Sequence, residues 1–169
     1  MKKEILFGYR LSNADCCEYG DDDGFSIIIY KDGTAMYTTY IVSDIINKCK
    51  KFRISNETVT EIRSNIDKNK KKISALNKDI DNGSCDGVFN IFIFGKKKIS
   101  ALNIEEHNIK TLSLINPKYY IEYHSVIIQE NIIINIFKEI CSILRKNHAI
   151  RLDLNSIKIP LWLFINRLK

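Results

Sequence analysis

Apolar and polar residues alternate along much of the N-terminal half of the chain, a pattern typical of β-strands with one buried face. Residues 4–11 form the first such segment. Residues 25–30 and 34–42 form two more, and the turn-forming tripeptide Lys31-Asp32-Gly33 separates them. Because aspartate and glycine accept the positive φ angles of a tight turn, residues 25–42 predict a β-hairpin.

Another extended segment covers residues 45–54, but lysines interrupt its alternation. Lys48, Lys50 and Lys51 fall on both sides of the expected strand. Charged residues of this kind are common on outer strands, where they discourage pairing with other molecules. The segment therefore predicts an edge strand.

The second half of the chain contains a further pair of extended runs. Residues 88–94 and 98–104 flank the glycine-containing tripeptide Gly95-Lys96-Lys97. This arrangement predicts a second hairpin over residues 88–104. The preceding residues 79–87 are rich in turn-forming residues and predict a loop.

Two segments have the periodicity of amphipathic helices. In residues 56–70, Val59, Ile62 and Ile66 form one apolar stripe, and Ser55 is a suitable N-cap. Asn116-Pro117 is a favourable start for a second helix, because asparagine caps and proline is tolerated at the first helical position. Its clearest part is residues 130–146, where one face is apolar and is expected to pack on the sheet.

The last part of the chain has a weaker pattern. Residues 149–159 alternate again and predict a final strand, which Pro160 interrupts. The last ten residues are assigned no element. Together these segments predict a single α+β domain over residues 1–169, with a mainly antiparallel sheet built from two β-hairpins and two packed helices.

The octapeptide KKKISALN occurs twice, at residues 70–77 and 96–103. The flanking sequences differ, so the repeat is not part of a domain-sized duplication. The first copy continues the helical stripe of residues 56–70, whereas the second follows a glycine turn. We therefore expect a helix in the first copy and a strand in the second.

The composition is that of a folded protein, with 45% hydrophobic and 27% charged residues. Isoleucine, lysine and asparagine are abundant, a bias typical of AT-rich genomes. The formal net charge of +6 comes largely from residues 31–78. A basic protein favours partners that carry phosphates or acidic side chains.

Targeting signals are not evident from the sequence. The N-terminal apolar stretch is shorter than the core of a secretory signal, and no run approaches the roughly 18 apolar residues of a membrane span. We therefore expect a cytoplasmic protein that does not associate with membranes. In a reducing cytoplasm the five cysteines are expected to be free thiols.

Metal and cofactor motifs are not recognisable in the sequence. The acidic cluster Asp21-Asp22-Asp23 does not fit a calcium loop, because that register places tyrosines at two ligand positions. The glycines are scattered singly, so no phosphate-binding loop is present. We expect no metal and no cofactor.

Catalytic motifs are equally weak. The sequence contains no nucleophile elbow of the G-x-S-x-G type. His124, in an aromatic-rich helical segment, is expected to be a packed or hydrogen-bonded residue, and His107 is expected to lie at the surface. No residue is assigned a catalytic role.

Lysine-rich segments are the candidates for nucleic-acid binding. The residues proposed for this role are the two triplets of the repeated octapeptide: Lys70, Lys71, Lys72, Lys96, Lys97 and Lys98. The sequence has no RNP, helix-turn-helix or zinc-finger pattern, so any such binding is expected to be nonspecific.

Two stretches, IYKDGTAMYTTY and NGSCDGVFNIFIF, resemble elements of small uncharacterised bacterial α+β proteins, in which a DG hairpin and a helix precede a second hairpin. The resemblance covers residues 25–104. Some proteins of this style look like toxin-neutralising immunity proteins. The resemblance implies an inhibitor-like protein partner, although an inhibitor of a nuclease would be acidic, unlike this chain.

Three functional hypotheses remain open at this point. The first is a non-enzymatic protein-binding domain, either immunity-like or accessory, with one protein partner. The second is nonspecific nucleic-acid binding through the lysine-rich surface. The third is a small enzyme or ligand-binding domain that uses His124, Cys85 or the acidic loops, which requires a deep pocket. The oligomeric state is left open.

Overall fold

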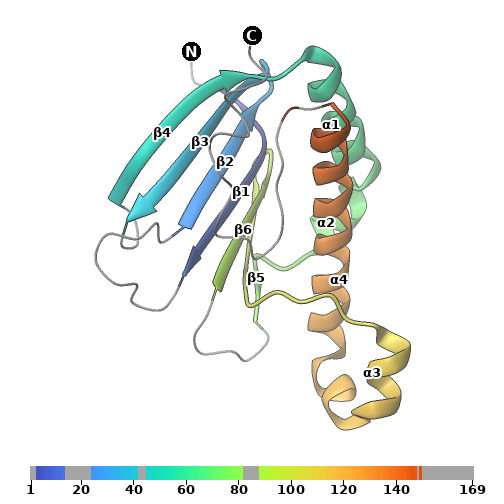
Figure 1. The fold of residues 1–169 in the computed structure, drawn as a ribbon. Coiled ribbons are helices and arrows are strands. Elements are labelled where there is room, and N and C mark those ends of the chain that lie inside the picture. The colour runs from blue at the N-terminus through green and yellow to red at the C-terminus, as the bar shows by residue number, and fades with distance from the viewer. Residues whose placement is uncertain (1–2, 14–23, 42–44, 82–87, 148, 150–169) are drawn as a thin grey trace.

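The computed structural model describes residues 3–13, 24–41, 45–81, 88–147 and 149. Seven strands and four helices lie within these ranges and form two layers (Figure 1). The strands are β1 (Ile5–Asn13), β2 (Gly24–Tyr30), β3 (Thr34–Ile41), β4 (Ile45–Arg53), β5 (Asp79–Ile80), β6 (Val88–Phe94) and β7 (Lys97–Leu102). The helices are α1 (Asn56–Lys68), α2 (Lys70–Ala75), α3 (Ile109–Ile115) and α4 (Pro117–Lys146).

The strands form one sheet in the order β4-β3-β2-β1-β6-β7-β5. All neighbouring pairs are antiparallel except β5 and β7, which are parallel. The α+β class and both predicted hairpins are confirmed. The prediction of two hairpins with two helices differs from the structure in detail. The strands expected at residues 4–11 and 45–54 are present as β1 and β4, whereas β5 and α3 were not predicted and α2 is a separate helix after α1.

The turn between β2 and β3 depends on one glycine. Gly33 has φ +79° and its N–H donates to the Tyr30 carbonyl at 3.0 Å. Asp32 was expected to share the positive φ, but it does not. Its carboxylate instead accepts a hydrogen bond from the Thr34 N–H at 2.9 Å, which closes the turn through the side chain.

The turn between β6 and β7 has only two residues, Gly95 and Lys96. Phe94 pairs directly with Lys97, and Gly95 has φ +60°. A left-handed glycine at the first turn position is the requirement of the type II′ hairpin, which matches the twist of the strands. The turn is therefore shorter than the predicted tripeptide.

Helix starts follow the capping residues seen in the sequence. Ser55 Oγ accepts a hydrogen bond from Thr58 N at 3.1 Å at the start of α1, and Asn116 Oδ1 accepts one from Tyr119 N at 3.2 Å at the start of α4. The α4 helix is uninterrupted over its 30 residues. The short helix α3 was not predicted, although Asn108 caps it in the same way.

The two copies of KKKISALN adopt the two expected conformations. The first copy contains α2, which follows α1 after a break at Asn69, and the second contains β7. Ile73 and Ile99, at the same position in each copy, are both buried. Both copies therefore contribute an isoleucine to the core from different backbone conformations.

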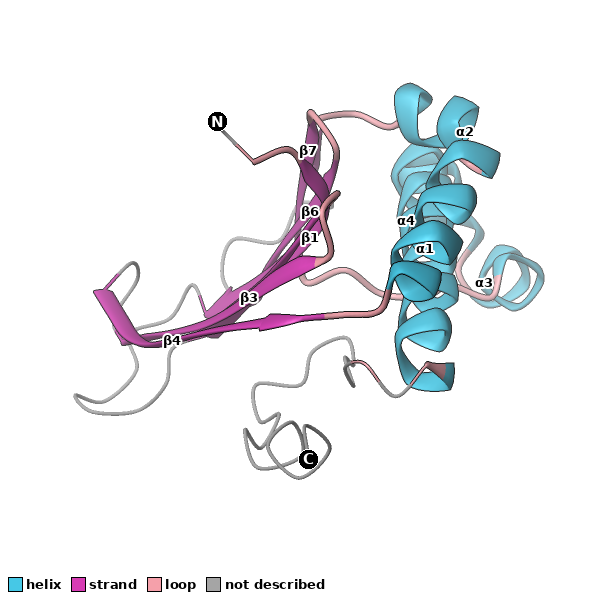
Figure 2. Cartoon of the chain, turned by 90° about the horizontal axis from the view of Figure 1, so that it is seen from above, coloured by secondary structure: helices cyan, strands magenta, loops and turns pink. Residues whose placement is uncertain are grey.

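The core lies between the helices and one face of the sheet (Figure 2). Phe137 of α4 packs on three aromatic rings of the central strands, with ring centroids 4.5 Å from Tyr9, 5.4 Å from Phe92 and 6.3 Å from Phe7. The Tyr9 hydroxyl donates to Asn90 Oδ1 at 2.7 Å. This contact supplies a partner to a polar side chain in the interior.

Several predictions fall on residues outside the described ranges. They are the loop around the acidic cluster, residues 150–159 of the predicted final strand, and the cysteines Cys16, Cys17 and Cys85. Of the described cysteines, Cys49 is exposed and Cys141 is buried, and neither is part of a disulfide bond. None of the described helices is long and apolar enough to span a lipid bilayer.

We predict that Gly24→Ala destabilises the fold through a backbone clash. A Cβ at Gly24 would lie 2.2 Å from the Leu11 carbonyl oxygen on the neighbouring strand. Relief requires the strands to move, so we expect a loss of about 3 kcal/mol in the free energy of unfolding, measured with urea. In Gly8→Ala the three atoms nearest to the new Cβ all belong to the Ile93 side chain, the closest at 3.2 Å, and the loss should be below about 1 kcal/mol. Equal losses would contradict this account.

We also predict that Asp32→Asn flattens the acid dependence of stability. The hydrogen bond from Lys3, and after it those from Thr34, hold the pKa of the Asp32 carboxyl well below its usual range. A lowered folded-state pKa stabilises the fold above the unfolded pKa, and this stability is lost as pH falls. Between about pH 5 and pH 2, the free energy of unfolding measured with urea should fall less in the variant than in the wild type. Asp67→Asn, at an exposed carboxylate, is the control and should retain the wild-type slope.

Candidate binding surfaces

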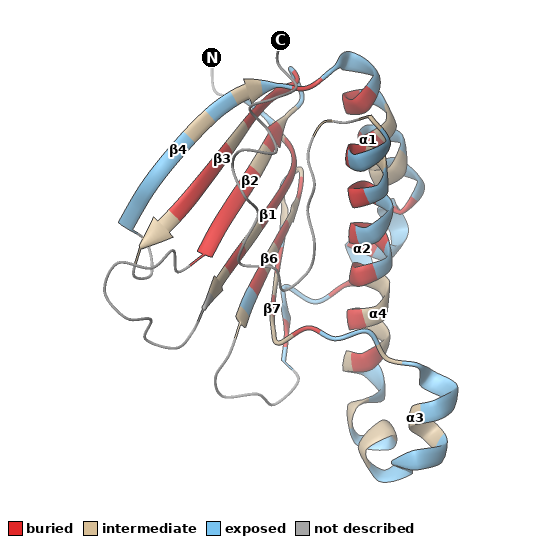
Figure 3. Ribbon diagram, viewed as in Figure 1, coloured by how far each residue is buried: buried red, intermediate tan, exposed pale blue. Residues whose placement is uncertain are grey.

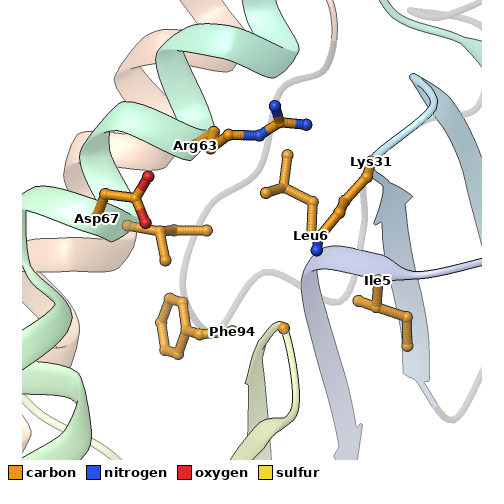
Figure 4. Close-up of a pocket in the computed structure, with 8 residues that line it drawn as sticks. Ile5, Leu6, Lys31, Arg63, Asp67 and Phe94 are labelled. Atoms are coloured by element: carbon orange, nitrogen blue, oxygen red, sulfur yellow. The ribbon is translucent and has the colours of Figure 1, made fainter.

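A shallow groove lies between α1 and the strand ends beside it (Figure 4). It has a volume of about 400 Å³ and is lined by Ile5, Leu6, Lys31, Arg63, Ile66, Asp67, Phe94 and Gly95. Arg63 extends from α1 across the apolar floor (Figure 4).

An ion pair lies beside this groove. Lys31 Nζ lies 2.5 Å from Glu4 Oε2, and this bond lowers the pKa of the Glu4 carboxyl. Arg63 and Asp67 lie one turn apart on α1 and have opposite charges. The lining residues include no histidine, cysteine or serine, so they contain neither a Ser-His nor a Cys-His pair.

His107 was expected to lie at the surface, but it is largely buried. Its side chain is 14% exposed, and its Nε2 lies 2.8 Å from Oε2 of Glu130, whose side chain is 1% exposed. The His107 N–H donates to Asn131 Oδ1 at 2.8 Å, and Asn131 Nδ2 donates to the His107 carbonyl at 2.9 Å. These three bonds hold the segment before α3 against α4, so the role of His107 is structural.

The expectation for His124 was wrong in the opposite direction. His124 is exposed, and its ring lies 5.0 Å from the Tyr120 ring in an edge-on contact. Burial, followed by the negative charge of Glu130, raises the pKa of the nearby Tyr119 hydroxyl. In this region, His107 and Glu130 form a largely buried contact, whereas His124 is exposed beside the Tyr120 ring.

The two lysine triplets lie on neighbouring elements. Lys70, Lys71 and Lys72 are exposed on α2. Lys97 Nζ donates to the Leu76 carbonyl at 2.7 Å, so the β6–β7 turn lies beside the end of α2. Lys97 and Lys98 are consecutive strand residues and project to opposite faces of the sheet. The β6–β7 turn with Lys96 therefore lies near α2, whereas Lys97 is held by a structural bond and Lys98 projects from the face opposite to Lys97.

Outer strand β4 is the most cationic element of the sheet. It contains Lys48, Lys50, Lys51 and Arg53 and no acidic residue. Every side chain of β4 is exposed or half-buried, as Figure 3 shows by its pale colour. The expected edge strand is confirmed, and we call this element with its open side the β4 edge.

A second exposed surface lies where the helices extend past the sheet. It consists of α3 and residues 117–126 of α4, and we call it the helical tip (Figure 1). Leu114, Ile115 and Ile121 are 83%, 78% and 77% exposed on it. Sequence reasoning missed this surface, although Asn108 followed by the apolar residues of α3 was the available signal.

Metal binding finds no support in the described ranges, where no group of three potential ligands comes together. Comparison with known proteins adds no assignment: no protein-family model matches the chain, and no curated protein is significantly similar to it. The candidate sites therefore have to be judged on their geometry, which offers two exposed surfaces, the helical tip and the β4 edge.

Proposed function

We propose that this chain is a non-enzymatic protein-binding domain that holds a partner protein on its helical tip. The observation that carries the proposal is the exposure of Leu114, Ile115 and Ile121 on one projecting helical hairpin. Clustered apolar side chains at the surface of a folded protein mark interaction sites more often than isolated ones do.

The energetics of the tip favour association. Full burial of one leucine or isoleucine side chain contributes about 1.5–3 kcal/mol. Three such side chains offset a substantial part of the translational and rotational entropy lost on binding, which is roughly 4–15 kcal/mol. The tyrosines Tyr119, Tyr120 and Tyr123 are half-buried beside them and add contact area at low entropic cost.

The tip is also rigidly presented. Asn108 and Asn116 cap its two helices, and the Tyr119 and Tyr123 rings lie 4.8 Å apart along α4. The bonds of His107 to Glu130 and Asn131 tie the start of the hairpin to the body. A preformed surface loses less conformational entropy on binding than a flexible one.

An immunity-like role is one form of this proposal. It rests on the resemblance of residues 25–104 to small bacterial α+β proteins, and on a surface rather than a pocket as the functional feature. With a net charge of +6, the chain suits an acidic partner better than a nuclease that binds polyanions.

We predict that a photo-crosslinking amino acid in place of Leu114 joins the chain to one discrete partner protein in the cells that make it. The matched control carries the same amino acid at Asn135, an exposed position farther along α4. The double substitution Leu114→Ser with Ile115→Ser should weaken binding of that partner more than tenfold, because it removes two buried aliphatic groups.

The same double variant tests whether the tip is a binding surface or part of the fold. Its free energy of unfolding should change by less than about 0.5 kcal/mol per substitution, because the side chains are exposed. Identical adducts at Leu114 and Asn135 would contradict the proposal. An adduct with a second copy of the chain would make the tip a dimer interface instead.

A second candidate function is nonspecific nucleic-acid binding through the lysine triplets. The observation in its favour is the bond from Lys97 to the Leu76 carbonyl, which brings the β6–β7 turn beside α2. Lys70, Lys71, Lys72 and Lys96 then contribute the positive charges, whereas Lys98 projects from the other face of the sheet. Such binding requires no specific base contacts and depends on the release of counterions from the phosphates.

For this candidate we predict retention on single-stranded DNA or RNA that falls steeply between about 50 and 200 mM salt. Replacing Lys70, Lys71 and Lys72 with alanine should weaken binding and reduce the salt dependence. A control with the same charge change replaces Lys48, Lys50 and Lys51. Equal effects of the two triple variants would indicate a response to net charge alone, and no retention at low salt would exclude this function.

A further inference from the structure

We infer that the β4 edge binds an acidic, extended segment of a partner protein as an additional strand of the sheet. This surface is separate from the helical tip, and the inference does not depend on it. Three observations carry it: the position of β4, the direction of its backbone groups, and the distribution of its charges.

The first observation is that β4 is an outer strand of the described sheet and pairs only with β3 along its length. Figure 2 shows β3 and β4 curving away from the helix layer. The opposite edge is β5, which has only two residues. Of the two edges, only β4 is long enough to pair with an incoming segment.

The second observation concerns backbone hydrogen bonds. Ile54 N–H donates to the Gly33 carbonyl at 3.0 Å, and antiparallel partners alternate between bonded and non-bonded pairs. Following the register, Phe52, Lys50 and Lys48 bond to β3. Their neighbours Arg53, Lys51 and Cys49 therefore direct their N–H and carbonyl groups to the outer side.

The third observation is that cations flank the open edge on both faces. Lys48 and Lys50 pair with Thr39 and Tyr37, which are buried on the helix-facing side. Lys51 and Arg53 alternate with them and project from the other face. A strand added to this edge projects side chains to both faces, so acidic residues on either face would meet a cation.

Two alternative occupants fit these observations less well. A second copy of β4 would place like charges beside one another, which is destabilising across strands. A single-stranded nucleic acid gains affinity by stacking its bases on exposed aromatic rings, whereas the one aromatic residue of β4, Phe52, is half-buried.

The register shift between Thr39 and Tyr40 sets the length of the site. It distorts the ladder beyond Lys48, so the regular part of the edge is residues 49–53. Three residues there offer outward backbone groups. The segment that fits is therefore short, about five residues in an extended conformation.

The test uses a fluorescein-labelled, capped peptide of the sequence EEVEVEE and a twin in which the three central backbone amides are N-methylated. N-methylation keeps the charge and removes the backbone donors. We expect the full-length protein to bind the first peptide at least about tenfold more tightly than the twin in fluorescence anisotropy.

Two variants of one residue separate backbone pairing from charge. Lys51→Pro removes an outward N–H together with the charge, and it leaves the bonds to β3 in place. Lys51→Gln removes only the charge. We expect at least about tenfold weaker binding for the proline variant and about threefold for the glutamine variant. Leu114→Ser with Ile115→Ser, at the helical tip, should leave peptide binding unchanged.

Amide hydrogen exchange of the wild-type protein gives an independent readout if the proline variant does not fold. In the free protein the amides of Lys48, Lys50 and Phe52 should exchange slowly, and those of Cys49, Lys51 and Arg53 rapidly. The peptide should slow the second set only. Equal binding of the two peptides would overturn the inference. So would displacement of the peptide by an oligonucleotide of equal charge, if the amides of Cys49, Lys51 and Arg53 are not slowed in exchange.

Discussion

The packing of Phe137 against Tyr9, Phe92 and Phe7 is the contact on which the other features of this structure depend. It places α4 over the central strands β1 and β6, where the Tyr9 ring lies 4.5 Å from Phe137. The same tyrosine donates its hydroxyl proton to Asn90, a fully buried amide. An aromatic cluster around one satisfied polar pair fixes the helix position more precisely than aliphatic packing alone, because both the ring geometry and the hydrogen bond must be met.

Both candidate surfaces arise because the two layers differ in size. The α4 helix is about 45 Å long, whereas a nine-residue strand spans about 30 Å. With the docking point set by Phe137, burial on α4 begins at Ile127 and the first turns extend beyond the sheet as the helical tip. The sheet in turn continues through β3 to β4, past the helices. The helices therefore expose aliphatic side chains where they extend past the sheet, and the sheet exposes strand backbone where it extends past the helices.

Local signals predicted much of the fold, and long-range contacts account for what they missed. Ser55, Gly33 and Asn116 act within a few residues of their own positions, so the sequence predicts α1, the first turn and the start of α4. In contrast, β5 exists because Ser100 N–H donates to the Lys78 carbonyl at 2.7 Å across the sheet. The position of His107 depends on Glu130, 23 residues away. Neither contact leaves a periodic pattern in the sequence.

The candidate sites were harder to predict than the fold, and the repeated octapeptide shows why. Lys71 and Lys97 hold equivalent places in the two copies, yet Lys71 is exposed on a helix and Lys97 donates to a backbone carbonyl. The role of a lysine is thus set by the element that carries it. The lysines of β4 follow the same rule: a solvent-exposed strand edge gives them a row of backbone groups to flank, whereas the lysines of α2 lie on a six-residue helix, which has no strand edge. Charge alone attracts an acidic partner to either element, but only β4 adds hydrogen bonds that distinguish an extended peptide from other polyanions.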